Sequence, residues 1–148
     1  MNKNVIVKKL VDVFNMNNEF IKAIEEQDLK LRITSARSNT IGSQLACVAR
    51  ARDAYSKCII NDEEFSWNPD FPYDDRYEHT KLSKHLIEKS SKLIKEYESF
   101  NNLSENQLSL TMDLLGHEFL HQGQLIRYIY ANNLSMPNLI KSFWHLED

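Results

Sequence analysis

Four long segments repeat apolar residues with the 3.6-residue period of an α-helix, and no other feature of the chain constrains its fold as strongly. They cover approximately residues 5–27, 40–60, 77–100 and 104–133 of a chain of 148. Ser104 and Gln107 form a Ser-x-x-Gln capping box, which marks the beginning of the fourth segment. Because each amphipathic helix must bury one face, the pattern predicts an all-α protein, specifically a four-helix bundle.

The composition agrees with this prediction. The chain has only three glycines and three prolines, too few for a sandwich or barrel with a turn about every 8–12 residues. Gly42, Gly116 and Gly123 are also too far apart to form a Gly-rich phosphate loop. The length and an apolar fraction of 42% fit one domain, residues 1–148, with a core of its own.

Residues 61–76, between the second and third segments, form an unusually long connection, since helix–helix loops are typically about 2–8 residues. They hold six acidic residues (Asp62, Glu63, Glu64, Asp70, Asp74 and Asp75) and four aromatic ones (Phe65, Trp67, Phe71 and Tyr73). Two interpretations stay open: a functional lid or binding loop, or a segment whose aromatic rings plug one end of the bundle. Residues 138–148 predict a short fifth helix that carries Phe143 and Trp144.

Charge and hydropathy exclude several classes of function. A net charge of -3 and a pI near 6.0 give no basic patch for nucleic acid. No segment approaches the roughly 20 apolar residues of a membrane span, and the first residues lack the apolar run of a signal peptide. Cys47 and Cys58 lie on one predicted helix about 16 Å apart, too far for a disulfide. We therefore expect a reduced, soluble, cytoplasmic protein.

The fourth segment contains the most informative motif, a pair of histidines at positions 117 and 121. Residues four apart share one face of a helix, so His117 and His121 can chelate a single metal ion. Their stripe is otherwise apolar, with Leu110, Leu114, Leu125 and Tyr128. Buried imidazoles need polar partners, and we favour a metal over hydrogen-bonded core histidines.

The same residues spell His-Glu-x-x-His, the signature in which a glutamate acts as general base in zinc peptidases. On an ideal helix Glu118 is rotated by about 100° from His117, so it either reaches a metal-bound water or faces solvent. A peptidase also needs a cleft, usually with an edge strand, to hold extended substrate. An all-helical chain offers no such strand, so the sequence argues against peptidase activity.

Two histidines do not complete a site, because catalytic zinc uses three protein ligands and one open position. Cys47 on the second segment and His79 on the third are the candidates for the third ligand. A degenerate site, or water in place of the third ligand, is a further alternative. His85 and His145 are expected to be peripheral.

Residues 40–47 (Thr-Ile-Gly-Ser-Gln-Leu-Ala-Cys) and 117–124 (His-Glu-Phe-Leu-His-Gln-Gly-Gln), on the second and fourth helices, together resemble the DinB/YfiT-like family of metal-dependent enzymes. The resemblance covers nearly the whole chain. It implies a four-helix bundle that holds zinc or nickel through one histidine on helix two and a His-x-x-x-His pair on helix four. The pair matches His117 and His121, whereas the helix-two ligand falls on Cys47, a departure from the usual triad.

The resemblance also implies a function, since characterised members include thiol-dependent transferases and isomerases. By this likeness the chain is a metal-dependent thiol (S-)transferase or related hydrolase, with a low-molecular-weight thiol as cosubstrate and a small-molecule substrate. We expect a homodimer and a site open to a pocket lined partly by residues 61–76. The alternative is a non-catalytic, stress-associated bundle for binding or dimerisation, whose metal site is structural or degenerate.

The positions of the glycines suggest a packing hypothesis. Gly42 precedes Cys47 by five residues, and Gly116 and Gly123 bracket the histidine pair. Each glycine costs a helix about 1 kcal/mol relative to alanine. We therefore expect them to let helices two and four approach closely around the metal ligands.

Overall fold

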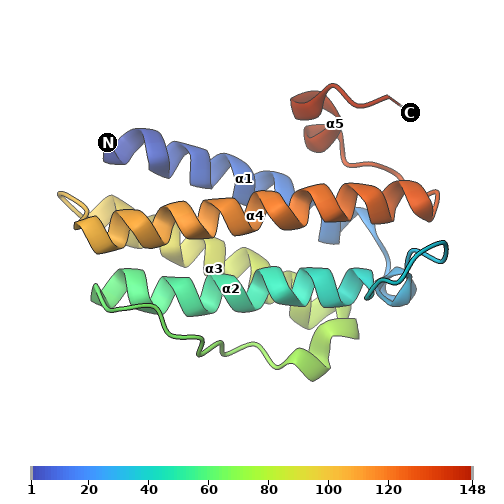
Figure 1. Cartoon of the computed structure of the whole chain (residues 1–148), viewed down its shortest axis with the longest axis horizontal. Coiled ribbons are helices and arrows are strands. Elements are labelled where there is room, and N and C mark those ends of the chain that lie inside the picture. Colours follow the sequence, from blue (N-terminus) through green and yellow to red (C-terminus); the bar gives the residue numbers. More distant parts are fainter. Residues whose placement is uncertain (1, 148) are drawn as a thin grey trace.

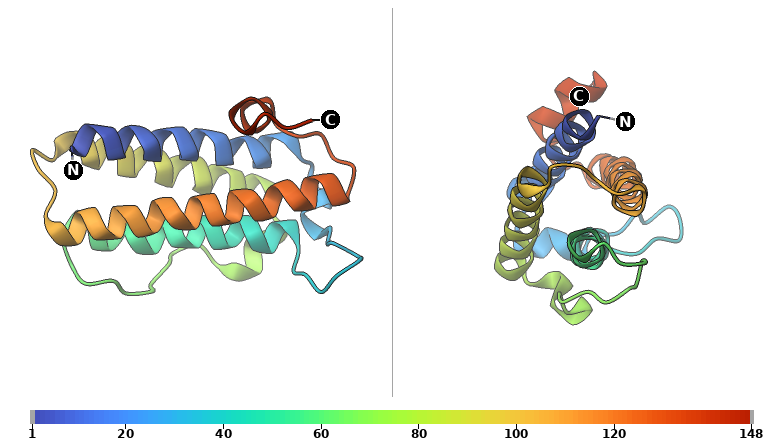
Figure 2. Two further views of the ribbon diagram at one scale, coloured as in Figure 1. Left: turned by 45° about the horizontal axis from the view of Figure 1, so that its top comes forward. Right: turned by 90° about the vertical axis from the view of Figure 1, so that its left-hand side faces the viewer.

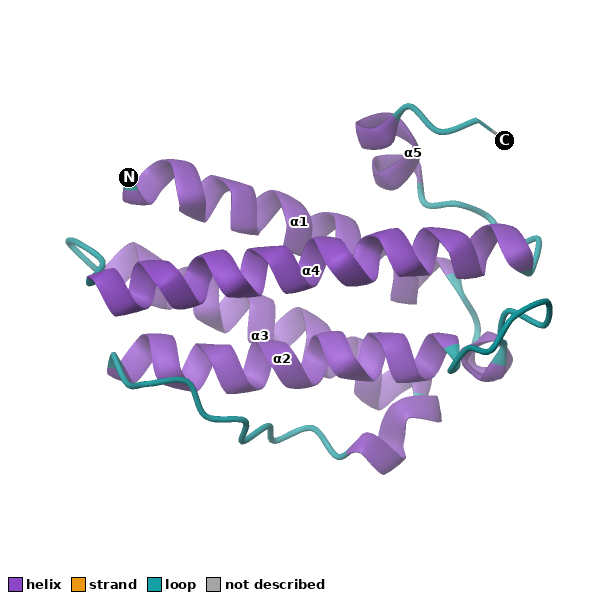
Figure 3. Cartoon of the chain, viewed as in Figure 1, coloured by secondary structure: helices purple, strands orange, loops and turns teal. Residues whose placement is uncertain are grey.

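The computed structural model describes residues 2–147, and this part of the chain is helical without any strand (Figure 3). The elements are α1 (Lys3–Ala23), η1 (Glu26–Lys30), α2 (Ile41–Asn61), η2 (Tyr73–Tyr77), α3 (His79–Ser99), α4 (Glu105–Ala131) and α5 (Asn138–Trp144), where η denotes a 3₁₀ helix. The all-α prediction and the short fifth helix are confirmed. No helix within residues 2–147 combines the length and the apolarity needed to cross a bilayer.

The four long helices lie side by side around a shared apolar core (Figure 2). Each packs against two of the others: α2 against α3 and α4, and α1 against the same two helices. Figure 1 shows that α2 and α3 run in the same direction, because the segment between them returns along the length of α2. The long connection is thus the element that makes this topology feasible.

The helix ends follow from local capping. Ser104 Oγ accepts a hydrogen bond from the Gln107 amide at 3.0 Å, and Gln107 Oε1 accepts one from the Ser104 amide at 3.0 Å, so the predicted capping box is confirmed. The first helix ends at Ala23, earlier than predicted. A second capping box, from Glu25 and Asp28, instead begins the separate helix η1.

The connection between α2 and α3 follows the side of α2 and does not cover an end of the helices (Figure 1). Of its four aromatic residues only Phe71 is buried, while Phe65, Trp67 and Tyr73 are 45%, 50% and 42% exposed. The interpretation of these rings as a plug is therefore wrong for three of the four. The segment is anchored by Asp53 of α2, whose Oδ2 accepts the amide hydrogens of Asp70 at 3.0 Å and Phe71 at 2.9 Å.

The hypothesis that the three glycines let α2 and α4 approach closely is wrong at all three positions. A Cβ atom added at Gly116 or Gly123 would meet no described atom within 4 Å, so neither glycine permits a close helix approach. A Cβ at Gly42 would lie 2.4 Å from the Arg76 carbonyl oxygen. Gly42 thus does permit a close contact, but its neighbour is η2, and α4 is not involved.

Candidate metal centre

Cys47 on α2 and His117 and His121 on α4 come together where these two helices pack. One ligand-type atom from each residue lies within 4.8 Å of the other two. Cys47 Sγ and His117 Nε2 are 3.6 Å apart. Tetrahedral zinc with Zn–S of about 2.3 Å and Zn–N of about 2.0–2.1 Å places sulfur and nitrogen about 3.6 Å apart. The sulfur–nitrogen distance therefore suits a shared metal ion, although it also fits a weak hydrogen bond between thiol and imidazole.

His121 is held in one orientation by a chain of hydrogen bonds. Its Nδ1 lies 2.5 Å from Gln44 Oε1, an acceptor, so Nδ1 carries the proton and donates it. Gln44 Nε2 in turn donates to Asn39 Oδ1 at 3.0 Å, and the Tyr128 hydroxyl donates to the same oxygen at 2.5 Å. The lone pair of His121 is thereby left on Nε2. A hydrogen bond from the second ring nitrogen is the usual way in which proteins orient metal-binding histidines.

His117 lacks such support. Its buried Nδ1 has no hydrogen-bond partner among the described residues, an arrangement that costs about 1–3 kcal/mol in a protein interior. Its ring lies 4.4 Å from that of His121, measured between centroids. Burial lowers the pKa of His117, although the Glu118 carboxylate opposes the shift. Burial and the neighbouring His117 lower the pKa of His121 to about 4, so both imidazoles are neutral at pH 7, the form that binds metal.

Cys47 is a partly buried free thiol. Burial raises its pKa, and the positive charge of Arg50, one turn along α2, partly opposes that rise. The thiol therefore keeps its proton at neutral pH unless a cation displaces it. Cys58, the other cysteine, is also free, which agrees with the prediction that the two do not form a disulfide.

Glu118 occupies a position that neither sequence interpretation anticipated. Its side chain is completely buried and forms a two-pronged ion pair with Arg52 of α2, which is equally buried. Arg52 Nε donates to Oε1 at 2.6 Å and Nη2 to Oε2 at 3.0 Å, while Asn17 Nδ2 donates to Oε2 at 2.7 Å. A carboxylate bound in this way is not available as a general base. The His-Glu-x-x-His run therefore does not form a peptidase site.

Arg52 was not among the candidate residues predicted from the sequence, although its spacing carries a signal. Arg52 follows Val48 by four residues and Leu45 by seven, which places a charged side chain on a stripe that is otherwise apolar. A charge on such a stripe requires a buried partner of opposite sign. Gln44 was missed in the same way, although it lies one turn before Cys47.

The remaining histidines lie outside the cluster. His79 Nε2 is 2.7 Å from the Ile21 carbonyl oxygen, so this alternative third ligand is not brought to the pair on α4. His85 Nε2 is 2.7 Å from Asp53 Oδ1, so it is a partner of the loop anchor and more than a peripheral residue. His145 is the C-cap residue that follows α5, with a φ of 53°.

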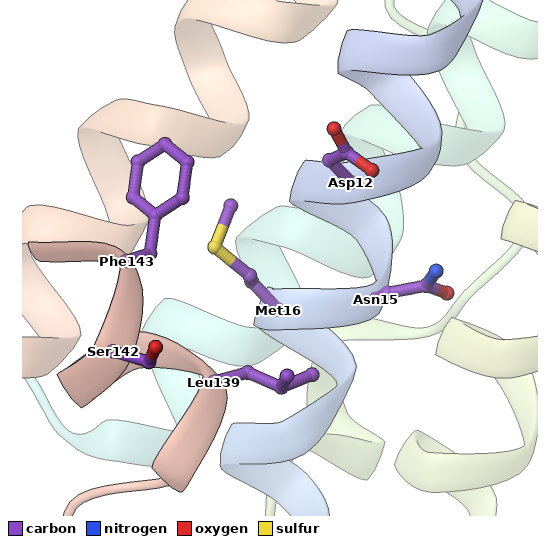
Figure 4. Close-up of a pocket in the computed structure, with 6 residues that line it drawn as sticks. All are labelled: Asp12, Asn15, Met16, Leu139, Ser142 and Phe143. Atoms are coloured by element: carbon purple, nitrogen blue, oxygen red, sulfur yellow. The ribbon is translucent and has the colours of Figure 1, made fainter.

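The cluster does not line the groove shown in Figure 4. That groove, of about 320 Å³, lies between α1 and α5 and is lined by Asp12, Asn15, Met16, Leu139, Ser142 and Phe143. Residues 61–76 do reach the neighbourhood of the cluster, because the Tyr73 hydroxyl donates to Ser43 Oγ at 3.1 Å, one turn before Cys47.

Comparisons of the chain with protein-family models, curated proteins and solved structures find no match. The resemblance to DinB-like proteins therefore rests on the two motif regions and the order of the helices.

Proposed function

We propose that this chain is a DinB-like four-helix bundle that binds one zinc or nickel ion through Cys47, His117 and His121. We further propose that it uses this site in a thiol-dependent reaction of a small molecule. The observation that carries the proposal is the convergence of three ligand-type atoms, from two helices, within 4.8 Å. A metal ion could take the Cys47 sulfur and one ring nitrogen of each histidine as ligands, with His117 bound through Nε2, the atom that lies 3.6 Å from the sulfur.

The chemistry of the donor set supports a site with an open position. Zinc prefers four ligands, and the chain supplies three, of which Cys47 and His117 are partly exposed. When bound, the metal would act as a Lewis acid that stabilises the thiolate form of a coordinating thiol at neutral pH. Gln44 orients His121 for this task.

The proposal is tested first by metal analysis. Protein prepared without added metal is incubated with zinc or nickel, and the bound ion is counted per chain. We expect one ion in the parent and a loss of affinity of more than about 100-fold in His121→Ala, which exceeds the effect usual for an outer-shell residue. His79→Ala is the matched control, because its ring bonds to the Ile21 carbonyl, and it should bind metal like the parent. A parent that binds neither ion contradicts the proposal.

Cobalt substitution tests the role of Cys47 directly. A cobalt-loaded parent should show a thiolate-to-cobalt charge-transfer absorption, and Cys47→Ser should lose that band while Cys58→Ser retains it. Retention of the band in Cys47→Ser would exclude Cys47 as a ligand. Turnover of a model electrophile with a thiol, present in the parent and absent in His121→Ala, then separates a catalyst from a bundle whose metal is only structural.

A further inference from the structure

Arg50, close to Cys47 on α2, is a positively charged residue without a negatively charged partner among the described residues. Arg50 follows Cys47 by three residues on α2, so both side chains lie on the same side of that helix. Its guanidinium lies 5.8 Å from the ring centroid of Trp67 and 5.7 Å from that of Tyr73. Both distances are within the range of cation–π contact. Both rings belong to the connection that follows α2, and they contact the guanidinium of Arg50.

Arg50 has no ion pair and no hydrogen bond within residues 2–147, and its Nε is buried without a partner. The acidic connection beside it does not supply one: Asp70 pairs with Lys57 at 2.6 Å, and Asp75 with Lys81 at 3.5 Å. Arg76 differs from Arg50 in its ion pair and its hydrogen bond, although its Nε is likewise buried without a partner among the described residues. It stacks on the same Tyr73 ring at 4.4 Å, but it also donates to the Tyr73 carbonyl and faces Asp74 at 3.9 Å.

A guanidinium presents five donors in a planar fork, which matches the two oxygens of a carboxylate. A single arginine balances a single negative charge. The six acidic residues of the adjacent connection disfavour an anion of higher charge, such as a phosphate monoester. The half-exposed rings of Trp67 and Tyr73 also provide an apolar surface for the part of a ligand that carries the carboxylate.

We propose that Arg50, with Trp67 and Tyr73, binds the carboxylate of the small-molecule substrate next to the Cys47–His117–His121 cluster. The assignment of this carboxylate to a substrate rests on the proposed function, whereas the anion site itself does not. Tyr73 links the two sites, because its ring contacts Arg50 and its hydroxyl bonds to Ser43, one turn before Cys47. The substrate class is therefore a small carboxylic acid with an apolar portion adjacent to the acid group.

The test titrates benzoate into the protein and follows the indole N–H resonance of Trp67, assigned with Trp67→Phe. Benzamide serves as the uncharged isostere and phenyl phosphate as the dianion. We expect saturable binding of benzoate, weaker binding of phenyl phosphate and none of benzamide. Arg50→Gln should weaken benzoate binding by about 10–150-fold, the range for hydrogen bonds to a charged group. The benzoate affinity of Arg50→Lys should lie between those of the parent and Arg50→Gln, because lysine keeps the positive charge but lacks the planar fork of donors.

Arg76→Gln is the matched control and should bind benzoate within about threefold of the parent. Equal benzoate binding by the parent and Arg50→Gln, or no binding by a folded parent, overturns the proposal. Tighter binding of phenyl phosphate overturns the assignment to carboxylates. Each titration is run on chelator-treated and on zinc-loaded protein. If the protein binds benzoate but not zinc, the anion site is supported and the proposed metal function is contradicted. If it binds zinc but not benzoate, only the anion site is contradicted.

Discussion

Two neighbouring faces of α4 carry polar residues into the protein, and they differ in whether these polar groups have hydrogen-bond partners. Glu118 and Gln122 lie on one face, and every polar group there has a partner: Arg52 and Asn17 bind Glu118, while Gln122 donates to Asn17 and accepts from the Trp144 indole. His117 and His121 lie on the other. There, among the described residues, His117 Nδ1 has no hydrogen-bond partner, and the Cys47 sulfur lies 3.6 Å from His117 Nε2.

The difference separates buried polar residues that stabilise the fold from polar residues that could bind a ligand. A buried polar network whose groups are all bonded has no capacity left for a ligand, and its members stabilise one arrangement of the helices. On the other face the Cys47 sulfur and the Nε2 atom of His117 make only one weak contact, with each other, so both can still bind a ligand. Glu118 and the two histidines belong to the same five-residue motif, so membership of the motif alone does not distinguish the two faces.

The largest expected effect, on the free energy of unfolding, comes from removing the buried ion pair between Glu118 and Arg52. Glu118→Gln removes the only negative charge that faces Arg52 in the ion pairs described. Breaking a buried pair typically costs about 3–5 kcal/mol, a large part of the roughly 5–15 kcal/mol stability of a domain. The free energy of unfolding, measured by urea denaturation, should fall by that amount, whereas Glu118→Leu with Arg52→Met should recover much of it.

The matched control for Glu118→Gln is Asp12→Asn, which breaks the surface pair between Lys8 and Asp12. The two side chains of this pair are 78% and 45% exposed, so the change in unfolding free energy should stay below about 1 kcal/mol. If Glu118→Gln costs no more than this control, the claim that Glu118 belongs to the structural face is wrong.

A smaller effect is expected from the hydrogen bond that orients the other face. Gln44→Leu removes the acceptor of the His121 Nδ1 proton. Outer-shell partners of metal-binding histidines contribute about 10–100-fold to metal affinity. The affinity for zinc, measured against a competing chelator, should fall by that factor, while the number of ions per chain stays at one. An unchanged affinity in Gln44→Leu would indicate that the hydrogen bond does not prepare His121 for a metal.

The contrast between the two faces also shows which structural features could be predicted from the sequence alone. The helices and the pairing of His117 with His121 follow from local periodicity, because residues four apart share a face in any α-helix. The partners of Glu118 do not follow from it. Arg52 is 66 positions away from Glu118 in the chain and Asn17 is 101 positions away, so their pairing depends on how the helices pack.

The third candidate ligand illustrates the same limit. Periodicity allows both Cys47 and His79 to face the core, and the choice between them depends on which helices are neighbours. The structure places α2 beside α4 across the histidine pair, while His79 bonds to α1. Spacing along the chain contains no information on that long-range packing, so it left both residues open as the third ligand.

The smallest expected effect concerns a third, exposed face of α4, which carries Gly116 and Gly123. Both glycines have open space around them, so Gly116→Ala and Gly123→Ala should each stabilise the protein by up to about 1 kcal/mol in urea denaturation. The affinity for zinc should not change. Gly42→Ala is the contrasting variant and should destabilise the protein, because its Cβ would lie 2.4 Å from the Arg76 carbonyl oxygen. A loss of zinc affinity in Gly116→Ala or Gly123→Ala would show that these glycines do shape the metal face.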